Sequence, residues 1–186
     1  MHRLALIGLV IAAGCGDRTQ VVRMNGLEAP PPTSLSQLAS DVRNDGGYVF
    51  VGAVVSVPTP IESAFVPAPY EGTQVEIPRA ATDVSISDSL GADMPAVVAV
   101  YGADGPAVLV DEGGDPSERY VLEDDGGTWQ SHALPESGTW LFFVQPNADR
   151  HALIWRSAVN DGVADGEGTQ SGDDISLDTL RQNSGT

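Results

Sequence analysis

Side chains suited to nucleophilic or acid–base catalysis are few in this 186-residue chain. Apart from His2, its histidines are His132, which directly follows Ser131, and His151. A serine hydrolase needs a serine that is activated by a histidine, which an acidic residue orients. Neighbouring side chains of an extended segment point apart, and the chain has no G-x-S-x-G sequence to place a serine on a sharp turn. We therefore expect surface histidines, no catalytic residue and no enzymatic activity; a hydrolase with an unrecognised site is the alternative.

Carboxylates are the commonest potential metal ligands, because the chain has 26 Asp and Glu residues but one cysteine and three histidines. This composition does not supply the recurring His and Cys ligands of a zinc site. Residues 161–166 (DGVADG) begin like a calcium-binding loop, but Val163 replaces a ligand and Gly172 stands where a Glu should close the loop. We expect solvated acidic turns and no metal or cofactor, and leave calcium binding open. A second acidic group with the same expectation consists of Asp111, Glu112, Asp115 and Glu118.

The three tryptophans could line a ligand-binding surface, since some small β-barrels bind oligosaccharides on one face of the sheet. Trp140 and Trp155 lie within strongly apolar segments and are expected in the core. Trp129 lies in a polar, turn-rich segment. We therefore expect Trp129 to be exposed and to be the possible ligand-binding residue of the three.

The only cysteine, Cys15, follows an unbroken apolar or small segment, residues 4–13. As a helix this segment would span roughly 15 Å, about half of the hydrocarbon core of a bilayer. With Arg3 before it and the small residues Ala12 to Gly14 leading to the cysteine, the segment resembles a bacterial lipoprotein signal, although Ala12 stands where that family most often has Leu. The resemblance implies cleavage before Cys15, lipidation of Cys15 and anchoring on the extracytoplasmic side of the plasma or outer membrane.

The charge of the chain is strongly negative. Nine basic residues, all of them arginine, face 26 acidic residues, for a net charge of −17. Removal of residues 1–14 would remove Arg3 and no acidic residue, so the mature chain would be more negative still. A field of this sign repels nucleic acid and anionic lipid headgroups. We therefore exclude a nucleic-acid partner.

The chain divides into three parts by composition. Residues 1–14 are the signal peptide, and residues 15–33 form a tether without hydrophobic periodicity that contains three consecutive prolines. Residues 34–186 are expected to form a single acidic β domain. That domain has no disulfide available, but at roughly 150 residues it is long enough to bury a core without one.

Helical spacing of apolar residues predicts a short helix over residues 34–44, capped by Ser34, and another over residues 174–182, capped by Asp174. Between them, β-branched and aromatic segments predict strands, with a bend or bulge at Gly52. Proline-rich residues 59–79 are expected as a long loop with at most edge pairing, Gly-rich residues 161–173 as a loop, and residues 113–127 as acidic turns. The predicted strands cover residues 48–57, 82–87, 96–101, 107–110, 139–145 and 152–159, the last two joined by a hairpin at residues 147–151.

The order of these segments resembles exported bacterial domains of OB-like, netrin-like topology, over residues 36–182. The resemblance implies a mainly β fold, a small five-stranded, partly closed barrel, with a short N-terminal and a C-terminal helix. No functional residue carries over from it. Its four motifs correspond to residues 49–57 (VFVGAVVSV), 83–93 with an inserted Ala92, 98–102 (VAVYG) and 137–143 (SGTWLFF).

Together these features predict a non-enzymatic lipoprotein of the cell envelope. We expect a binding or scaffolding module for a protein or glycan partner.

Overall fold

The computed structural model describes residues 20–23, 31–67, 72–104, 107–111, 120–123 and 133–183, with the backbone alone at 20–23, 111 and 120–123. The fold is mainly β, as predicted. The elements in chain order are β1 (Gln20–Arg23), α1 (Leu35–Asn44), β2 (Tyr48–Val54), β3 (Thr59–Pro67), β4 (Thr73–Ser89), β5 (Val97–Ala103), β6 (Val108–Asp111), β7 (Tyr120–Glu123), β8 (Thr139–Asn147), β9 (Arg150–Asn160), β10 (Val163–Ala164), β11 (Ile175–Ser176) and α3 (Leu177–Gln182).

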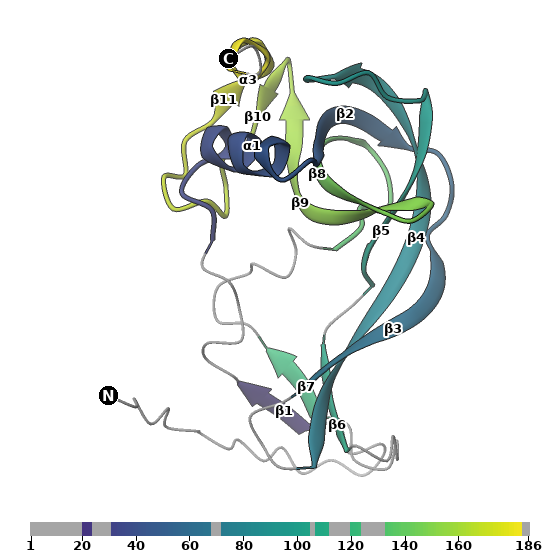
Figure 1. Cartoon of the computed structure of the whole chain (residues 1–186). Coiled ribbons are helices and arrows are strands. Elements are labelled where there is room, and N and C mark those ends of the chain that lie inside the picture. The colour runs from purple at the N-terminus through teal and green to yellow at the C-terminus, as the bar shows by residue number, and fades with distance from the viewer. Residues whose placement is uncertain are drawn as a thin grey trace.

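Five strands form a ring in the order β2–β4–β5–β9–β8, and β8 returns to β2 (Figure 1). Four of these pairings are antiparallel, whereas β5 and β9 run parallel. The parallel pairing comprises only Val100 with His151 and Tyr101 with Ala152, so the ring closes over a short length. This confirms the expected small, partly closed OB-like barrel.

The first strand of the ring, β2, is buried on both faces. Phe50 points into the barrel, where it stacks on Phe142 with ring centroids 5.3 Å apart. Val49 and Val51 point outward, into a second core. The pairing of β2 with β4 shifts register between Val51 and Gly52, which confirms the predicted irregularity at Gly52.

Helices α1 and α3 cover the outer face of the barrel and close the second core (Figure 1). Helix α1 presents Leu35, Ala39 and Val42 to that core, and the Ser34 side chain accepts a hydrogen bond from the Gln37 backbone N–H, as predicted. The cap of α3 is Ser176 and not Asp174. The reason is that residues 175 and 176 continue as strand β11, so the helix begins two residues later than predicted.

The prediction of a loop over residues 59–79 was wrong. This segment forms β3 and the first half of β4, which pair as a long antiparallel hairpin. Prolines are compatible with the pairing because Pro60 and Pro67 lie on β3, which pairs with β4 alone among the described strands, and Pro78 lies opposite a register shift between Ile61 and Ala64. Strand β4 therefore belongs both to the barrel and to an arm that extends from it (Figure 1).

At the far end of the arm, β4 pairs with β6, β6 with β7, and β7 with β1. The sequence did not predict β1 or β7. β1 is a short strand within the segment assigned to the tether, and it pairs in parallel with β7, 100 residues further along the chain (Gln20 with Tyr120). The prolines that end that segment also contact the domain: backbone carbonyls of Pro32 and Thr33 accept hydrogen bonds from the backbone of Gln170 and Ser171.

Residues 161–173, predicted as a loop, contain strand β10 and are held by several hydrogen bonds. Ser157 donates to the Asp165 carbonyl, and the Gly166 N–H donates to Asp174 Oδ1 at 3.0 Å.

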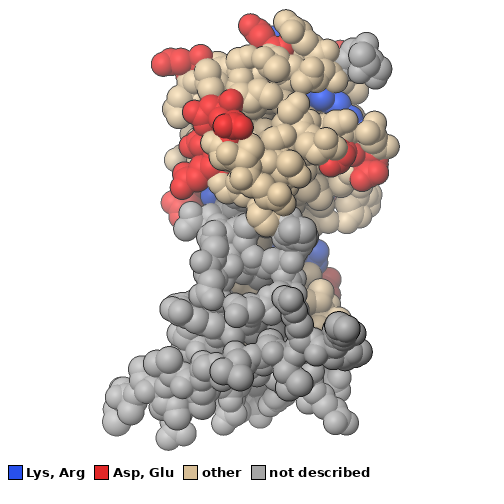
Figure 2. Space-filling view, turned by 90° about the vertical axis from the view of Figure 1, so that its left-hand side faces the viewer, with Lys and Arg blue, Asp and Glu red and all other residues tan. Residues whose placement is uncertain are grey.

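Figure 2 shows acidic side chains distributed over the described barrel end of one face, with few basic ones. No helix among the described residues is both long and apolar enough to cross a membrane.

Candidate functional site

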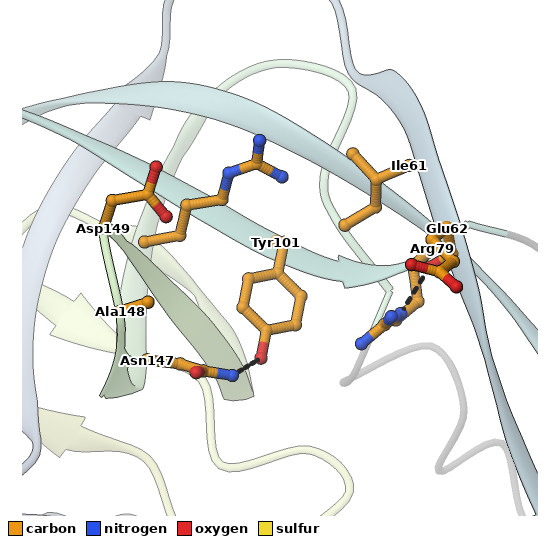
Figure 3. Close-up of a pocket in the computed structure, with 8 residues that line it drawn as sticks. Ile61, Glu62, Arg79, Tyr101, Asn147, Ala148 and Asp149 are labelled. Atoms are coloured by element: carbon orange, nitrogen blue, oxygen red, sulfur yellow. Dashed lines mark hydrogen bonds between the residues drawn. The ribbon is translucent and has the colours of Figure 1, made fainter.

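A cleft of about 260 Å³ lies where the β3–β4 hairpin leaves the barrel. One wall comes from β3 and β4, the floor from β5, and the opposite wall from the turn between β8 and β9 (Figure 3). The cleft is therefore formed by two strands of the barrel, β4 and β5, and by two connections between barrel strands, the one that contains β3 and the β8–β9 turn. Its lining residues are Ile61, Glu62, Arg79, Tyr101, Asn147, Ala148, Asp149 and Arg150.

Tyr101 lies at the centre of this lining, between Arg79 on one side and Asn147 on the other (Figure 3). Side chains alternate along β5, so that Val100 is fully buried inside the barrel and Tyr101 points outward, half-buried. Asn147 Nδ2 donates a hydrogen bond to the Tyr101 hydroxyl at 2.6 Å. The Arg79 guanidinium lies over the ring, 5.5 Å from its centroid, which is within the range of a cation–π contact.

Arg79 is held in place by the irregular pairing of the hairpin. Its Nε donates to the Glu62 carbonyl at 2.9 Å, at the point where β3 and β4 shift register. The residues beside Glu62 are displaced from regular pairing with β4. The Glu62 carbonyl oxygen can therefore accept a hydrogen bond from a side chain. The base of the hairpin is fixed as well, because the Thr82 hydroxyl donates to the Ser56 carbonyl at 2.6 Å.

The opposite wall is a tight turn. β8 and β9 pair as far as Asn147 and Arg150, leaving only Ala148 and Asp149 between them, a shorter connection than the predicted residues 147–151. Ala148 has φ of 52°, a left-handed conformation that costs a residue with a Cβ about 1–2 kcal/mol. Strained residues of this kind occur often at ligand clamps. Here the strained residue lines the cleft.

The cleft contains charges of both signs. Glu62 and Asp149 are exposed carboxylates, while the two guanidinium groups, Arg79 and Arg150, are half-buried. Together with the tyrosine hydroxyl and the asparagine amide, they form a polar lining around one aromatic ring. Such a lining can bind a polar ligand by several hydrogen bonds at once, and it holds no serine, cysteine or histidine that could act as a nucleophile.

The sequence did not predict this cleft. The segment that supplies Ile61, Glu62 and Arg79 was predicted as a loop. Residues 96–101 were predicted as a strand, and burial alternates along β5 in the structure. The signal that could have revealed the site is the single polar aromatic, Tyr101, at the end of an apolar strand.

Among the predicted site residues that the structure describes, His151 contacts Tyr48 edge to face, with ring centroids 5.6 Å apart, and its Nδ1 is buried without a hydrogen-bond partner. Trp155 is in the core, as predicted. Trp140 is half-buried, with the Arg156 guanidinium 4.2 Å from its ring centroid; burial lowers the pKa of Arg156. The structure does not bring His151 into the lining of the cleft.

Other predicted site residues lie outside the described part of the chain. These are Cys15, Trp129, Ser131 and His132, together with the acidic side chains at positions 111–118. Across the residues that the structure does describe, no three or more His, Cys, Asp or Glu side chains are grouped so as to hold a metal ion. In the calcium-like segment, one Asp165 carboxylate oxygen instead accepts a hydrogen bond from the Glu167 backbone N–H at 2.8 Å.

The fold and the cleft define a class: a mainly β, partly closed five-stranded barrel with a polar, aromatic cleft beside it. Comparisons of the chain with protein-family models, with curated proteins and with solved structures gave no match. Function is therefore inferred from the geometry of the cleft and from the sequence.

Proposed function

We propose that this chain is a lipid-anchored, non-enzymatic binding module of the bacterial cell envelope, and that its ligand site is the cleft around Tyr101. The partner would be a glycan or a protein exposed on the extracytoplasmic side. The anchor would be lipidated Cys15, following cleavage of the signal peptide.

The observation that carries this proposal is the position of the cleft in the barrel. Arg79 lies on the second strand of the ring in chain order and Tyr101 on the third. The flanking walls are the connection between its first and second strands and that between its fourth and fifth. OB barrels bind oligonucleotides and oligosaccharides with these same strands and connections. The fold analogy supports the location of a ligand site, whereas the class of ligand has to come from the residues.

The lining supports binding and not catalysis. A hydrolase of the serine type would need a histidine with its Nδ1 bonded to an orienting acid, but in His151 that atom is buried and unpartnered. A glycosidase would need a general acid in a desolvated environment, whereas Glu62 and Asp149 are both exposed.

The proposal can be tested by crosslinking in intact cells that export the lipidated protein. A photo-crosslinking amino acid at position 149, in the cleft, should capture a partner, and mass analysis of the adduct should show whether it is protein or glycan. Position 167 provides the matched control, because Glu167 is also an exposed acid but lies in the turn after β10.

The adduct at position 149 should decrease about tenfold or more with Tyr101→Ala, since central aromatic anchors carry much of the free energy of binding. Tyr101→Phe keeps the ring and should retain much of the adduct. Phe65→Ala, which removes an exposed ring of β3 outside the cleft, should leave the adduct unchanged. Equal adducts at positions 149 and 167, or no effect of Tyr101→Ala, would contradict the proposal.

A further inference from the structure

The arginines of the described residues divide into two groups. Three of them lie outside the cleft and bond to other parts of the fold: Arg43 donates to the carbonyls of Leu90 and Leu180, Arg156 donates to the carbonyl of Ala133 at 2.6 Å, and Arg181 pairs with Asp88 and Asp178. The remaining two side chains that the structure describes, Arg79 and Arg150, both line the cleft.

Neither cleft arginine forms an ion pair with any described residue, although the chain has 26 acidic residues and only nine basic ones. Arg79 lines the cleft and uses its Nε for the Glu62 carbonyl, which leaves its two terminal nitrogens as donors for a ligand. A guanidinium group presents its donors as a planar fork that matches the two oxygens of a carboxylate. Two such groups around one small cavity form a receptor for an anionic group.

From these contacts we infer that the cleft binds an acidic sugar, a residue of the uronic acid class within an oligosaccharide. The inference rests on the proposed function, and it specifies the chemical class of the ligand. The carboxylate would pair with Arg79 and Arg150, and the sugar hydroxyls would bond to the polar groups around them.

The other lining groups are suited to hydroxyls. The Tyr101 hydroxyl accepts from Asn147, so its own proton is available to a ligand oxygen. The exposed carboxylates of Glu62 and Asp149 accept hydrogen bonds from ligand hydroxyl groups. At about 260 Å³ the cavity is smaller than the roughly 300–1,000 Å³ of typical small-molecule sites, which suits one residue of a longer chain.

The same carboxylates argue against densely charged polymers. Glu62 and Asp149 lie beside the arginines, so a ligand with a charge on every unit, such as a nucleic acid, would meet like charge within the cleft as well as the −17 net charge of the chain. An acidic sugar carries its carboxylate among neutral hydroxyls. It therefore matches a lining that contains both cations and anions.

A peptide partner is less well matched. Peptides commonly add a strand to an exposed sheet edge, but β5 pairs on both sides, with β4 and β9. The free edge of β3 carries Pro60 and Pro67, and its pairing with β4 is irregular between Ile61 and Ala64.

The test compares ligands that share one sugar chain and differ in whether its carboxyl groups are charged. A hyaluronan oligosaccharide, in which glucuronate alternates with a neutral sugar, is compared with its fully methyl-esterified form, and titration calorimetry on the full mature chain would measure both. We expect the acid form to bind about tenfold or more tightly than the ester, because hydrogen bonds to charged groups are stronger than those between neutral groups. The difference should shrink at high salt.

Arg79→Gln and Arg150→Gln should each reduce binding of the acid about tenfold, reduce binding of the ester by less, and together abolish the preference. Arg181→Gln removes the same charge from an exposed ion pair on α3 and should change neither. Unchanged thermal stability of the variants would show that the fold is retained.

Three outcomes would overturn the inference. Equal affinity for the acid and the ester would mean that the cleft does not distinguish the charge of the ligand. Equal affinity for polyglutamate would mean that the cleft does not recognise the sugar. Absence of measurable binding to the acid would exclude the uronic acid class. Each of these can occur while crosslinking at position 149 still succeeds, so the inference can fail separately from the proposed function.

Discussion

At position 52, the absence of a side chain lets β2 lie against β4. A Cβ on Gly52 would be 2.7 Å from Val84 Cγ1 and 2.8 Å from the Ser85 carbonyl oxygen. The second contact is with backbone of the adjacent strand, which cannot move without disturbing the ladder. Gly52 is therefore required for close approach, at the point where the register shifts.

Gly52→Ala should lower the free energy of unfolding by about 1–3 kcal/mol, as overpacking in a core does. Chemical denaturation of the variant and the wild type measures this change. Gly46→Ala is the control: nothing lies within 4 Å of its Cβ, so only its φ of 78° should cost free energy, about 1 kcal/mol. A smaller loss for Gly52→Ala than for Gly46→Ala would show that the close approach is not a constraint.

Among the secondary-structure elements, α3 depends on a single side chain of α1 for part of its attachment. Arg43 donates to the Leu90 carbonyl at 2.7 Å and to the Leu180 carbonyl at 3.2 Å, and so joins α1, the end of β4 and α3. Burial lowers the pKa of Arg43, but a guanidinium group remains charged at any ordinary pH. Its bonds therefore persist at every pH at which the fold exists.

Arg43→Met should lower the free energy of unfolding by about 1.5–3 kcal/mol, because it leaves two carbonyls without a charged donor. Urea denaturation followed by circular dichroism measures this loss. Arg181→Gln, on the exposed face of α3, provides the comparison. The pKa of Arg181 is raised by its hydrogen bond to Asp88, but exposed ion pairs contribute little to stability. Equal losses for the two variants would show that the attachment of α3 does not depend on Arg43.

For the whole molecule, the negative charge and the proposed anchor act together. A net charge of −17 on the chain repels anionic headgroups, so the charge itself does not attract the chain to a membrane. In the proposed function, membrane attachment would therefore depend on a lipid at Cys15. The two cleft arginines would then lie within a molecular surface that is otherwise mostly anionic.

Cys15→Ser should prevent both processing of the signal peptide and stable attachment to the membrane. Cell fractionation and the mass of the protein in each fraction measure the two effects, because the precursor retains residues 1–14. A Cys15→Ser protein that remains in the membrane fraction and is trimmed to the wild-type size would contradict the lipoprotein assignment.

Local patterns in the sequence were sufficient to predict several elements. The Ser34 cap and the strand over β8 each depend on residues within one turn or one strand. The negative charge is likewise a property of composition. These features were predicted correctly because no distant partner decides them. The irregularity at Gly52 was predicted from the glycine alone, although Val84 and Ser85 of β4 set the constraint there.

The cleft was decided by the tertiary structure. It joins Glu62, Arg79, Tyr101 and Asp149, which come together only because β4 pairs with both β3 and β5 and because β9 closes the ring against β5. Residues 59–79 were predicted to be a loop because they are rich in proline. Local propensity does not show that Pro78 lies opposite a register shift. Strand register over long sequence separations is set by pairing partners, and it is register that places two arginines beside one tyrosine.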